Sequence, residues 1–186
     1  MIFGLTGKFA AGKGTVAERL KALGYRYHSL SDILREELAA RGVEEGRDAL
    51  REIGNELRQA GGAGALARRL LDRLSDGGDH IVDSIRNPAE VVELRKVDGF
   101  SLIAVDAPAR VRYERLRLRD RIGDPESWEA FQQMEAAELA SDDPTTQQLV
   151  ATLAMADHDI ENSGPLSELD SQLRALLELL KEGRQA

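Results

Sequence analysis

Residues 4–15 read Gly4-Leu5-Thr6-Gly7-Lys8-Phe9-Ala10-Ala11-Gly12-Lys13-Gly14-Thr15 and directly follow an apolar start. This stretch has the Gly-x4-Gly-Lys spacing of a phosphate loop between a strand and a helix. Glycines allow the backbone to adopt positive φ and to approach phosphate, so that successive N–H groups point into one anion-sized nest. The helix expected over 15–23 presents its positive end to the same anion. The sequence therefore predicts a nucleoside triphosphate site.

We expect the Lys13 side chain to contact the β and γ phosphates of the nucleotide. Gly14 stands where a Ser or Thr usually supplies a hydroxyl to Mg²⁺, and Thr15 comes one residue late. Because Mg²⁺ dehydrates reluctantly, we expect phosphate oxygens and water to hold it, with Thr15 as a further candidate ligand. The residues assigned to nucleotide binding in the loop are Gly7, Ala10, Ala11, Gly12, Lys13, Gly14 and Thr15.

Composition limits the class of protein. A chain of 186 residues is expected to form one domain with a sizeable core. The formal charge of −8 argues against non-specific nucleic-acid binding, and the absence of Cys excludes disulfides, thiolate zinc sites and cysteine nucleophiles. No apolar run approaches a membrane span, and the first residues begin a strand rather than a signal peptide. We expect a cytoplasmic protein, monomeric or homodimeric, without nucleic-acid or membrane partners.

Short apolar runs alternate with longer helical stretches. Strands are predicted at 1–5, 25–28, 81–83, 102–105 and 157–160, and helices near 15–23, 31–41, 48–60, 64–75, 88–96, 108–121, 126–139 and 165–181. Strands separated by helices imply parallel βαβ units. The predicted fold class is α/β: a doubly wound five-stranded parallel sheet with ligands at the carboxyl ends of its strands.

Three further segments carry candidate site residues. After the second strand, Ser31 or Asp32 can cap a helix that carries Arg35 in its first turns, a pattern that an ordinary capped helix also explains. The third strand ends at Asp83, which can orient Mg²⁺ through water, although it can equally cap the helix starting at Pro88. Arg86, three residues later, can bind a phosphate bidentately.

The fourth strand leads into a helix rich in arginine. At helical spacing Arg112, Arg115 and Arg119 share one face, which as a solvated basic surface needs no ligand. The alternative is a lid whose arginines stabilise the charge that phosphoryl transfer spreads over the equatorial oxygens, with Arg121 as a further candidate. The polar block 120–146, with Trp128 and Phe131 as internal anchors, would move as part of that lid.

The Lys-Gly-Thr ending of the phosphate loop resembles the nucleoside monophosphate kinases, adenylate kinase among them. The pattern Asp-x-x-Arg-x-Pro-x-Glu over 83–90 is similar to the deoxynucleoside monophosphate kinases, and its spacing differs by one residue from the Asp-Gly-x-Pro-Arg of adenylate kinase. The Asp-x-Leu-Arg segment at 32–35 resembles the acceptor segment of these kinases. The resemblance implies that Arg35 grips the acceptor phosphate and that Arg115 and Arg119 are lid arginines.

The turn after the last strand, Asn162-Ser163-Gly164, resembles the dephospho-coenzyme A kinases, in which an Asn-x-Gly turn lies beside the adenine. The resemblance therefore adds Asn162 and Gly164 to the nucleotide site, although a strand-to-helix turn also explains them. His28, His80 and His158 are expected to be isolated and structural, because their spacing forms no metal set.

Together these segments predict a single P-loop kinase domain over 1–186, with an acceptor-binding segment at about 29–64 and a lid at about 115–146. The expected reaction is ATP- and Mg²⁺-dependent phosphorylation of a nucleoside monophosphate, with a deoxynucleotide favoured. The acceptor phosphate is already anionic, so no general base is needed. The alternatives are a dephospho-coenzyme A kinase, whose hydroxyl acceptor needs a base such as Asp32, and a nucleotide-binding regulator that is not a kinase.

The predicted roles fall into four groups. Catalysis is assigned to Lys13, Arg86, Arg115 and Arg119, and nucleotide binding to the loop residues with Arg115, Asn162 and Gly164. Acceptor binding is assigned to Ser31, Asp32, Arg35 and Arg86, and the metal side to Asp83 and Thr15.

Overall fold

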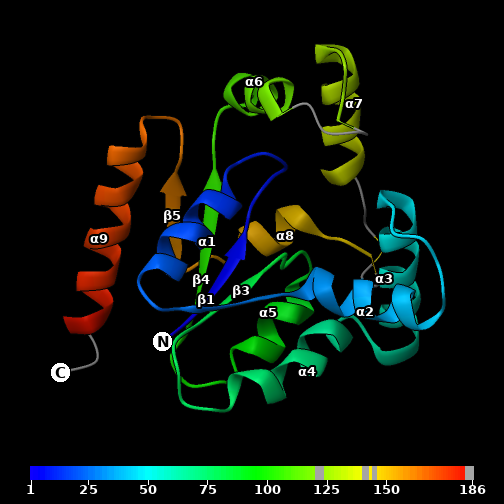
Figure 1. The fold of residues 1–186 in the computed structure, drawn as a ribbon, viewed down its shortest axis with the longest axis horizontal. Helices are drawn as coiled ribbons and strands as arrows, with labels where there is room; N and C mark the ends of the chain where they lie inside the picture. Colours follow the sequence, from blue (N-terminus) through cyan, green and yellow to red (C-terminus); the bar gives the residue numbers. More distant parts are fainter. Residues whose placement is uncertain (120–123, 140–142, 144–145, 183–186) are drawn as a thin grey trace.

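The computed structural model describes residues 1–119, 124–139, 143 and 146–182. Within these residues the centre is a five-stranded, all-parallel sheet of order β2-β3-β1-β4-β5 (Figure 1). The strands are β1 (Ile2–Thr6), β2 (Arg26–Ser29), β3 (His80–Asp83), β4 (Phe100–Asp106) and β5 (His158–Glu161). The predicted doubly wound parallel sheet is therefore confirmed.

The central strand β1 is the point where the winding changes direction. From β1 the chain runs out to β2 and back to β3 on one side, and then crosses to β4 and β5 on the other. Ligands of such sheets bind outside the carboxyl ends of the strands at this point. The fold thus places the predicted phosphate loop, which follows β1, at the position favoured for a ligand.

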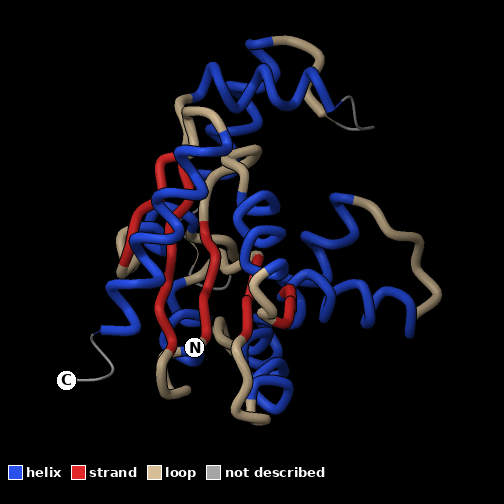
Figure 2. The backbone as a smooth tube through the Cα atoms, turned by 60° about the vertical axis from the view of Figure 1, so that its left-hand side comes forward, coloured by secondary structure: helices blue, strands red, loops and turns tan. Residues whose placement is uncertain are grey.

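Helices cover both faces of the sheet (Figure 2). They are α1 (Lys13–Ala22), α2 (Leu30–Ala40), α3 (Arg47–Gly61), α4 (Ala65–Leu71), α5 (Pro88–Leu94), α6 (Ala109–Arg119), α7 (Trp128–Leu139), α8 (Leu149–Leu153) and α9 (Leu166–Glu182), with a 3-10 turn at Asp72–Leu74. None of the described helices is long and apolar enough to cross a membrane. In Figure 1, α6 and α7 lie beyond the carboxyl ends of the strands.

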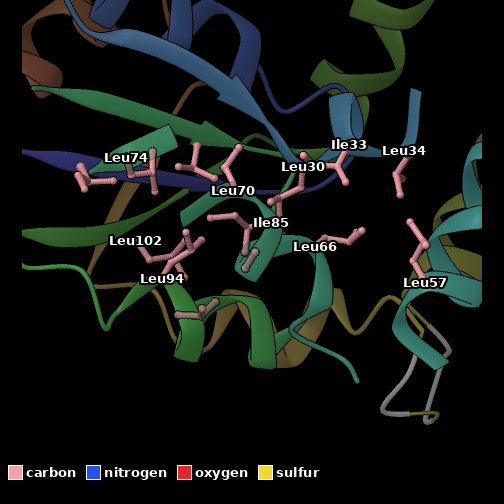
Figure 3. Packing of buried hydrophobic residues seen from close by; sticks show 14 of the residues in the cluster. Leu30, Ile33, Leu34, Leu57, Leu66, Leu70, Leu74, Ile85, Leu94 and Leu102 are labelled. Carbon is pink, nitrogen blue, oxygen red and sulfur yellow. The ribbon is translucent and has the colours of Figure 1, made fainter. Parts of the chain in front are cut away.

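The sheet separates two hydrophobic clusters. On one face Phe3 and Leu5 of β1 pack with Leu20 of α1 and Leu169 of α9. On the other face the cluster is formed by leucines and isoleucines of α2, α3, α4 and α5 together with residues of β3 and β4 (Figure 3). Burial of this apolar surface, at about 25 cal/mol per Å², is the main stabilising contribution that holds the loops at the sheet edge in place.

The structure differs from the predicted helices in three details. The helix predicted over 64–75 is α4 followed by a 3-10 turn, and α1 begins at Lys13 rather than residue 15. Helix α8 was not predicted, because a five-residue helix is too short to reveal a helical period. Arg121 and residues 120–123, 140–142 and 144–145 of the predicted lid lie outside the described residues.

Candidate functional site

The phosphate loop joins β1 to α1 and depends on two glycines. Gly7 has φ 152° and Gly12 has φ 102°, conformations that L side chains rarely adopt. A Cβ atom at Gly7 would collide with Val105 O, and one at Gly12 would collide with the Asn162 side chain. Ala10 also has a positive φ, of 59°. The close packing of this loop against β4 and the turn after β5 therefore requires glycine at these two positions.

The Lys13 side chain folds back over the phosphate loop and contacts its carbonyl groups. Lys13 Nζ donates to Gly7 O at 2.7 Å and to Lys8 O at 3.2 Å. Lys13 is also the first residue of α1, where backbone N–H groups have no acceptor inside the helix. A Cβ at Gly14 would meet no atom within 4 Å apart from its chain neighbours and the backbone of its own helix, and Thr15 follows it in the first turn of α1. A cation, helical N–H groups and open space therefore meet at the start of α1, as an anion site requires.

The side chains of Asn162 and Arg115 both donate hydrogen bonds to the phosphate loop. Asn162 is 5% exposed, and its Nδ2 donates to Ala11 O at 2.9 Å. Arg115 Nη1 donates to the same carbonyl at 3.3 Å, and Nη2 donates to Asn162 O at 2.5 Å. Burial lowers the pKa of the Arg115 guanidinium. These contacts join α6, the loop and the turn after β5, which ends near the exposed Gly164.

Asp83 lies at the carboxyl end of β3 and is 8% exposed. Its Oδ1 accepts from the Ser84 N–H at 2.6 Å, and its Oδ2 accepts from the Tyr27 hydroxyl at 3.0 Å. Burial, and next the charge of Asp83, raise the pKa of Tyr27 above its ordinary value. Ser84 has φ 66°, so the chain turns sharply after the strand. The carboxylate is thus held by two donors, and the Tyr27 contact was not predicted.

Arg86 is half-buried on the loop that follows Asp83. Its N–H donates to Glu90 Oε2 at 2.9 Å, and its Nη1 donates to Gln147 Oε1 at 3.2 Å. The cap of α5 is Asn87, whose Oδ1 accepts from the Ala89 N–H at 2.9 Å. The alternative role of Asp83 as the cap of this helix is therefore wrong, because Asn87 and Glu90 form the capping box.

The acceptor-side prediction is partly corrected. The N-cap of α2 is Ser29, which accepts from the Ser31 N–H at 3.2 Å, so Ser31 and Asp32 do not cap the helix. The helix begins at Leu30, immediately after β2 and one residue earlier than predicted. Exposed Arg35 forms ion pairs with Asp32 at 2.7 Å and Glu45 at 2.9 Å. The Glu45 hydrogen bond is the largest cause of the raised pKa of Arg35.

The three arginines of α6 have different environments, so the interpretation as one solvated face is wrong. Arg112 is 2% exposed; it donates to Ala107 O at 2.8 Å and to Phe9 O at 3.3 Å and pairs with Glu135 of α7. Exposed Arg119 pairs through both Nε and Nη2 with Asp124 at 2.8 Å, and its guanidinium lies 4.9 Å from the centre of the Phe9 ring. Two of these arginines therefore contact the phosphate loop at Phe9.

An aromatic cluster holds α7 against α6. Trp128 and Phe131 stack with ring centres 5.4 Å apart, and Tyr113 of α6 contacts both rings. The guanidinium of Arg110 lies 3.9 Å from the centre of the Trp128 ring. Trp128 and Phe131 are thus internal anchors, as predicted from the sequence.

The prediction that the three histidines are isolated is wrong for two of them. His28 Nε2 and His80 Nδ1 are 3.0 Å apart, and His80 Nε2 contacts Asp76 at 2.9 Å. The sequence hid this contact because neighbouring parallel strands bring together residues 52 positions apart. Within the part of the chain that the structure describes, no three His, Cys, Asp or Glu side chains cluster as a metal site.

Sequence reasoning also missed two ion pairs. Lys8 of the loop contacts Asp106 at the end of β4 at 2.9 Å, and Arg58 of α3 contacts Glu90 of α5 at 2.8 Å. The second pair is almost completely buried. A signal existed for Glu90, because Asn87-Pro88-Ala89-Glu90 has the spacing of a capping box.

Comparison with known proteins gives the following relationships. A family model described as an AAA domain matches residues 4–134. A UPF0200 protein of Hyperthermus butylicus is 31% identical over 183 residues, covering 97% of this chain and 95% of that one. A UPF0200/UPF0201 protein of Archaeoglobus fulgidus is 34% identical over 173 residues, covering 90% of this chain; the match spans about half (52%) of that longer protein.

Solved structures share the fold. TT1252 from Thermus thermophilus is similar with a TM-score of 0.64, 23% identity and coverage of 97% of both chains. A shikimate kinase from Bacteroides thetaiotaomicron has a TM-score of 0.61 and 14% identity, covering 97% of this chain and 98% of that one. A gluconokinase from Sinorhizobium meliloti has a TM-score of 0.54 and 16% identity, covering 97% and 93%. At these identities the likeness concerns the fold.

Proposed function

Because the chain belongs to the UPF0200 family and carries an AAA domain with a phosphate loop, we propose that it is an ATP- and Mg²⁺-dependent kinase of nucleoside monophosphates, with deoxynucleotides as the favoured acceptors. One observation carries the proposal. The phosphate loop follows β1, Asp83 ends β3 with Arg86 shortly after it, and the turn at Asn162 follows β5. These three strands belong to one parallel sheet, so the features lie at the same edge. A triphosphate and an anionic acceptor need cations and N–H donors gathered in this way.

On the nucleotide side, the N–H groups at the start of α1 and Lys13 are assigned to the β and γ phosphates. Lys13 Nζ, now on two loop carbonyls, is within the same loop and would exchange these acceptors for phosphate oxygens. Arg115 and Asn162 are assigned to the nucleotide site chiefly through their contacts with Ala11, which fix the shape of the loop. Gly164 is assigned beside the base.

The residues on the metal side fit Mg²⁺ held through water. Asp83 is a nearly buried carboxylate with both oxygens oriented by donors, and Thr15 lies in the first turn of α1. When bound, Mg²⁺ neutralises charge on the β and γ phosphates. Asp83 would orient water of the ion's hydration shell, and Thr15 would add a hydroxyl oxygen.

On the acceptor side, Arg86 and Arg35 are assigned to the phosphate of the acceptor, and Ser31 and Asp32 to the same segment, 29–64. The backbone N–H of Arg86 is fixed by Glu90. Arg35 is paired with two carboxylates, and the acceptor phosphate would replace them as its partner. A kinase for phosphate acceptors needs positioning and charge stabilisation but no base. Arg115, Arg119 and the segment 115–146 are proposed to form the lid.

A hydroxyl acceptor is the second candidate, since the structural relatives include a shikimate kinase. Such an acceptor needs a base, which would be Asp32 in a dephospho-coenzyme A kinase. In the structure one oxygen of the Asp32 carboxylate pairs with the Arg35 guanidinium at 2.7 Å, so that oxygen is engaged in an ion pair and not open to an acceptor hydroxyl. This contact favours the phosphate acceptor over the hydroxyl acceptor.

A coupled assay of ADP release tests the proposal. The panel contains the ribonucleoside and deoxynucleoside monophosphates, dephospho-coenzyme A and shikimate, each with ATP and Mg²⁺, and Lys13→Ala is the control for contaminating kinases. We expect ADP release that depends on one or a few monophosphates. Release that depends only on a hydroxyl acceptor favours the second candidate. ADP release that no acceptor stimulates would leave a nucleotide-binding regulator as the better description.

A further inference from the structure

A buried ion pair between Arg58 and Glu90 joins helices α3 and α5. Arg58 lies on α3, in the proposed acceptor segment, and Glu90 lies in the first turn of α5, after the loop of Arg86. Their side chains are 3% and 0% exposed. Glu90 Oε1 accepts from Arg58 Nε at 3.1 Å and from Nη2 at 2.8 Å. Both donors converge on one carboxylate oxygen in the protein interior.

The other oxygen of the same carboxylate holds the backbone at Arg86. Glu90 Oε2 accepts from the Arg86 N–H at 2.9 Å and from the Asn87 N–H at 3.1 Å. A single buried carboxylate therefore connects the guanidinium of Arg58 to the peptide that carries the Arg86 side chain. Helix α3 itself packs mainly against α2 and α4, so this pair is a direct connection between the acceptor segment and the loop after β3.

Stability alone gives a weak reason for this arrangement. Burying two charges costs desolvation energy that their attraction often only balances, and apolar residues of similar size are frequently as stabilising. What an apolar pair cannot provide is a charged acceptor for two backbone N–H groups. The distinctive consequence of the pair is thus the geometry it imposes on residues 86 and 87.

We propose that Arg58 is a positioning residue, which acts through Glu90 to fix Arg86 relative to α3 and to α2, the helix that carries Arg35. Arg58 itself does not contact the acceptor, because its guanidinium is buried and bonded to Glu90. The structural part of this proposal stands independently of the reaction. Its kinetic part rests on the proposed function, in which Arg86 binds the acceptor phosphate.

Hydrogen exchange of the ligand-free protein tests the structural part. Arg58→Met should accelerate exchange of the Arg86 and Asn87 amides at least tenfold relative to the amide of Val82 in β3. Arg58→Lys, which keeps a cation beside Glu90, should restore at least part of the protection. The matched control is Leu57→Ala, which removes a buried neighbour on α3 with a comparable loss of stability but leaves Glu90 paired. Unchanged relative exchange in Arg58→Met, or equal acceleration in Leu57→Ala, would overturn the proposal.

If Arg58→Met does not fold, the double variant Arg58→Met with Glu90→Gln is used in its place. This double variant leaves no unpaired buried charge. A neutral amide is a weaker acceptor than a carboxylate, so the same acceleration at residues 86 and 87 is expected. Relative exchange in the double variant that matches the wild type would also overturn the proposal.

Kinetics tests the consequence for the site, using the monophosphate with the highest kcat/KM in the panel above. At a temperature where every variant is folded, Arg58→Met or the double variant should raise the acceptor KM at least tenfold and change the ATP KM less than threefold. Leu57→Ala should change neither KM more than threefold. Faster exchange with an unchanged acceptor KM refutes the role of Arg58 in positioning Arg86 for the acceptor. If the wild type phosphorylates no acceptor, the proposed function fails while the exchange result still decides the link.

Discussion

Replacing Arg119 by alanine separates a lid arginine from an ordinary charged surface. In the structure Arg119 forms a partly exposed pair with Asp124 at 2.8 Å and lies 4.9 Å from the Phe9 ring centre. A surface ion pair contributes about 0–1 kcal/mol, and an exposed cation–π contact about 0.5–1 kcal/mol. The variant should therefore lose at most about 2 kcal/mol of stability, or less than about 8 °C in Tm for a chain of this size.

The expected effect on turnover is larger than this loss. If Arg119 closes on the transferring phosphoryl group, its charge acts mainly in the transition state, and kcat should fall at least about a hundredfold, or about 2.7 kcal/mol of barrier. The Kd for ATP should change much less. Single-turnover kinetics with ATP binding measured separately provides both values.

Arg117→Ala is the matched control, because Arg117 is an exposed arginine on the same helix. It should leave turnover and ATP binding close to wild type. A kcat in Arg119→Ala within about threefold of wild type, or an equal loss in both variants, would refute the lid role and return Arg119 to the charged surface of α6.

Five other substitutions have defined outcomes. Lys13→Ala should abolish phosphoryl transfer with little change in Tm, because the side chain donates to carbonyls of the loop and belongs to neither hydrophobic cluster; wild-type turnover would contradict the assignment of the loop. Arg35→Ala and Arg86→Ala should each raise the acceptor KM about ten- to hundredfold, the loss of a charge-assisted contact of about 1.5–3 kcal/mol, and leave ATP binding nearly unchanged in steady-state kinetics. Arg115→Ala should both weaken ATP binding and lower Tm, unlike Arg119→Ala, because Arg115 braces Ala11 and Asn162; calorimetry and nucleotide titration check this pair of effects. Burial, followed by the nearby charge of His80, lowers the pKa of His28, so the unfolded chain binds protons more readily. Denaturant titration should show stability falling as pH drops below about 6.5, and His28→Gln should reduce that slope.

The parts of the site that depend on local sequence were predictable. Gly7 and Gly12 are needed by the conformation of a loop within one strand-turn-helix unit, so their spacing alone reveals it. The order of strands and helices likewise follows from hydrophobic periodicity and the rules for parallel connections. Asp83 was placed at a strand end because a short apolar run stops there, and the structure has it as the last residue of β3.

Contacts between distant segments were not predictable in the same way. Arg58 and Glu90 are separated by 32 positions, and each alone is typical of a solvated helix. For Arg58 and for Arg112 of α6 the sequence did contain a signal, because each lies four residues from a buried position on its helix. Arg58 follows buried Gly54, and Arg112 precedes buried Leu116. A charge on the buried face of a helix indicates an internal partner, but only the tertiary structure identifies that partner.

The prediction of the N-cap of α2 was wrong for a different reason. Ser29, Ser31 and Asp32 are all good capping residues within four positions, so propensity does not choose between them. The end of β2 determines which residue caps the helix. The strand ends at Ser29 and α2 begins at the next residue without an intervening loop, so Ser29 is the cap. Element boundaries depend on such tertiary limits more than the elements themselves do.

The central claim is that this phosphate loop delivers the γ-phosphoryl group of ATP to an acceptor that already carries a phosphate. Phosphorus NMR of the reaction mixture, with ATP, Mg²⁺ and the panel of monophosphates, measures this directly. We predict a new β-phosphate resonance of a nucleoside diphosphate formed from the acceptor, in equal amount to the ADP released, and its absence with Lys13→Ala. Release of ADP together with inorganic phosphate, without a phosphorylated acceptor, would contradict the claim.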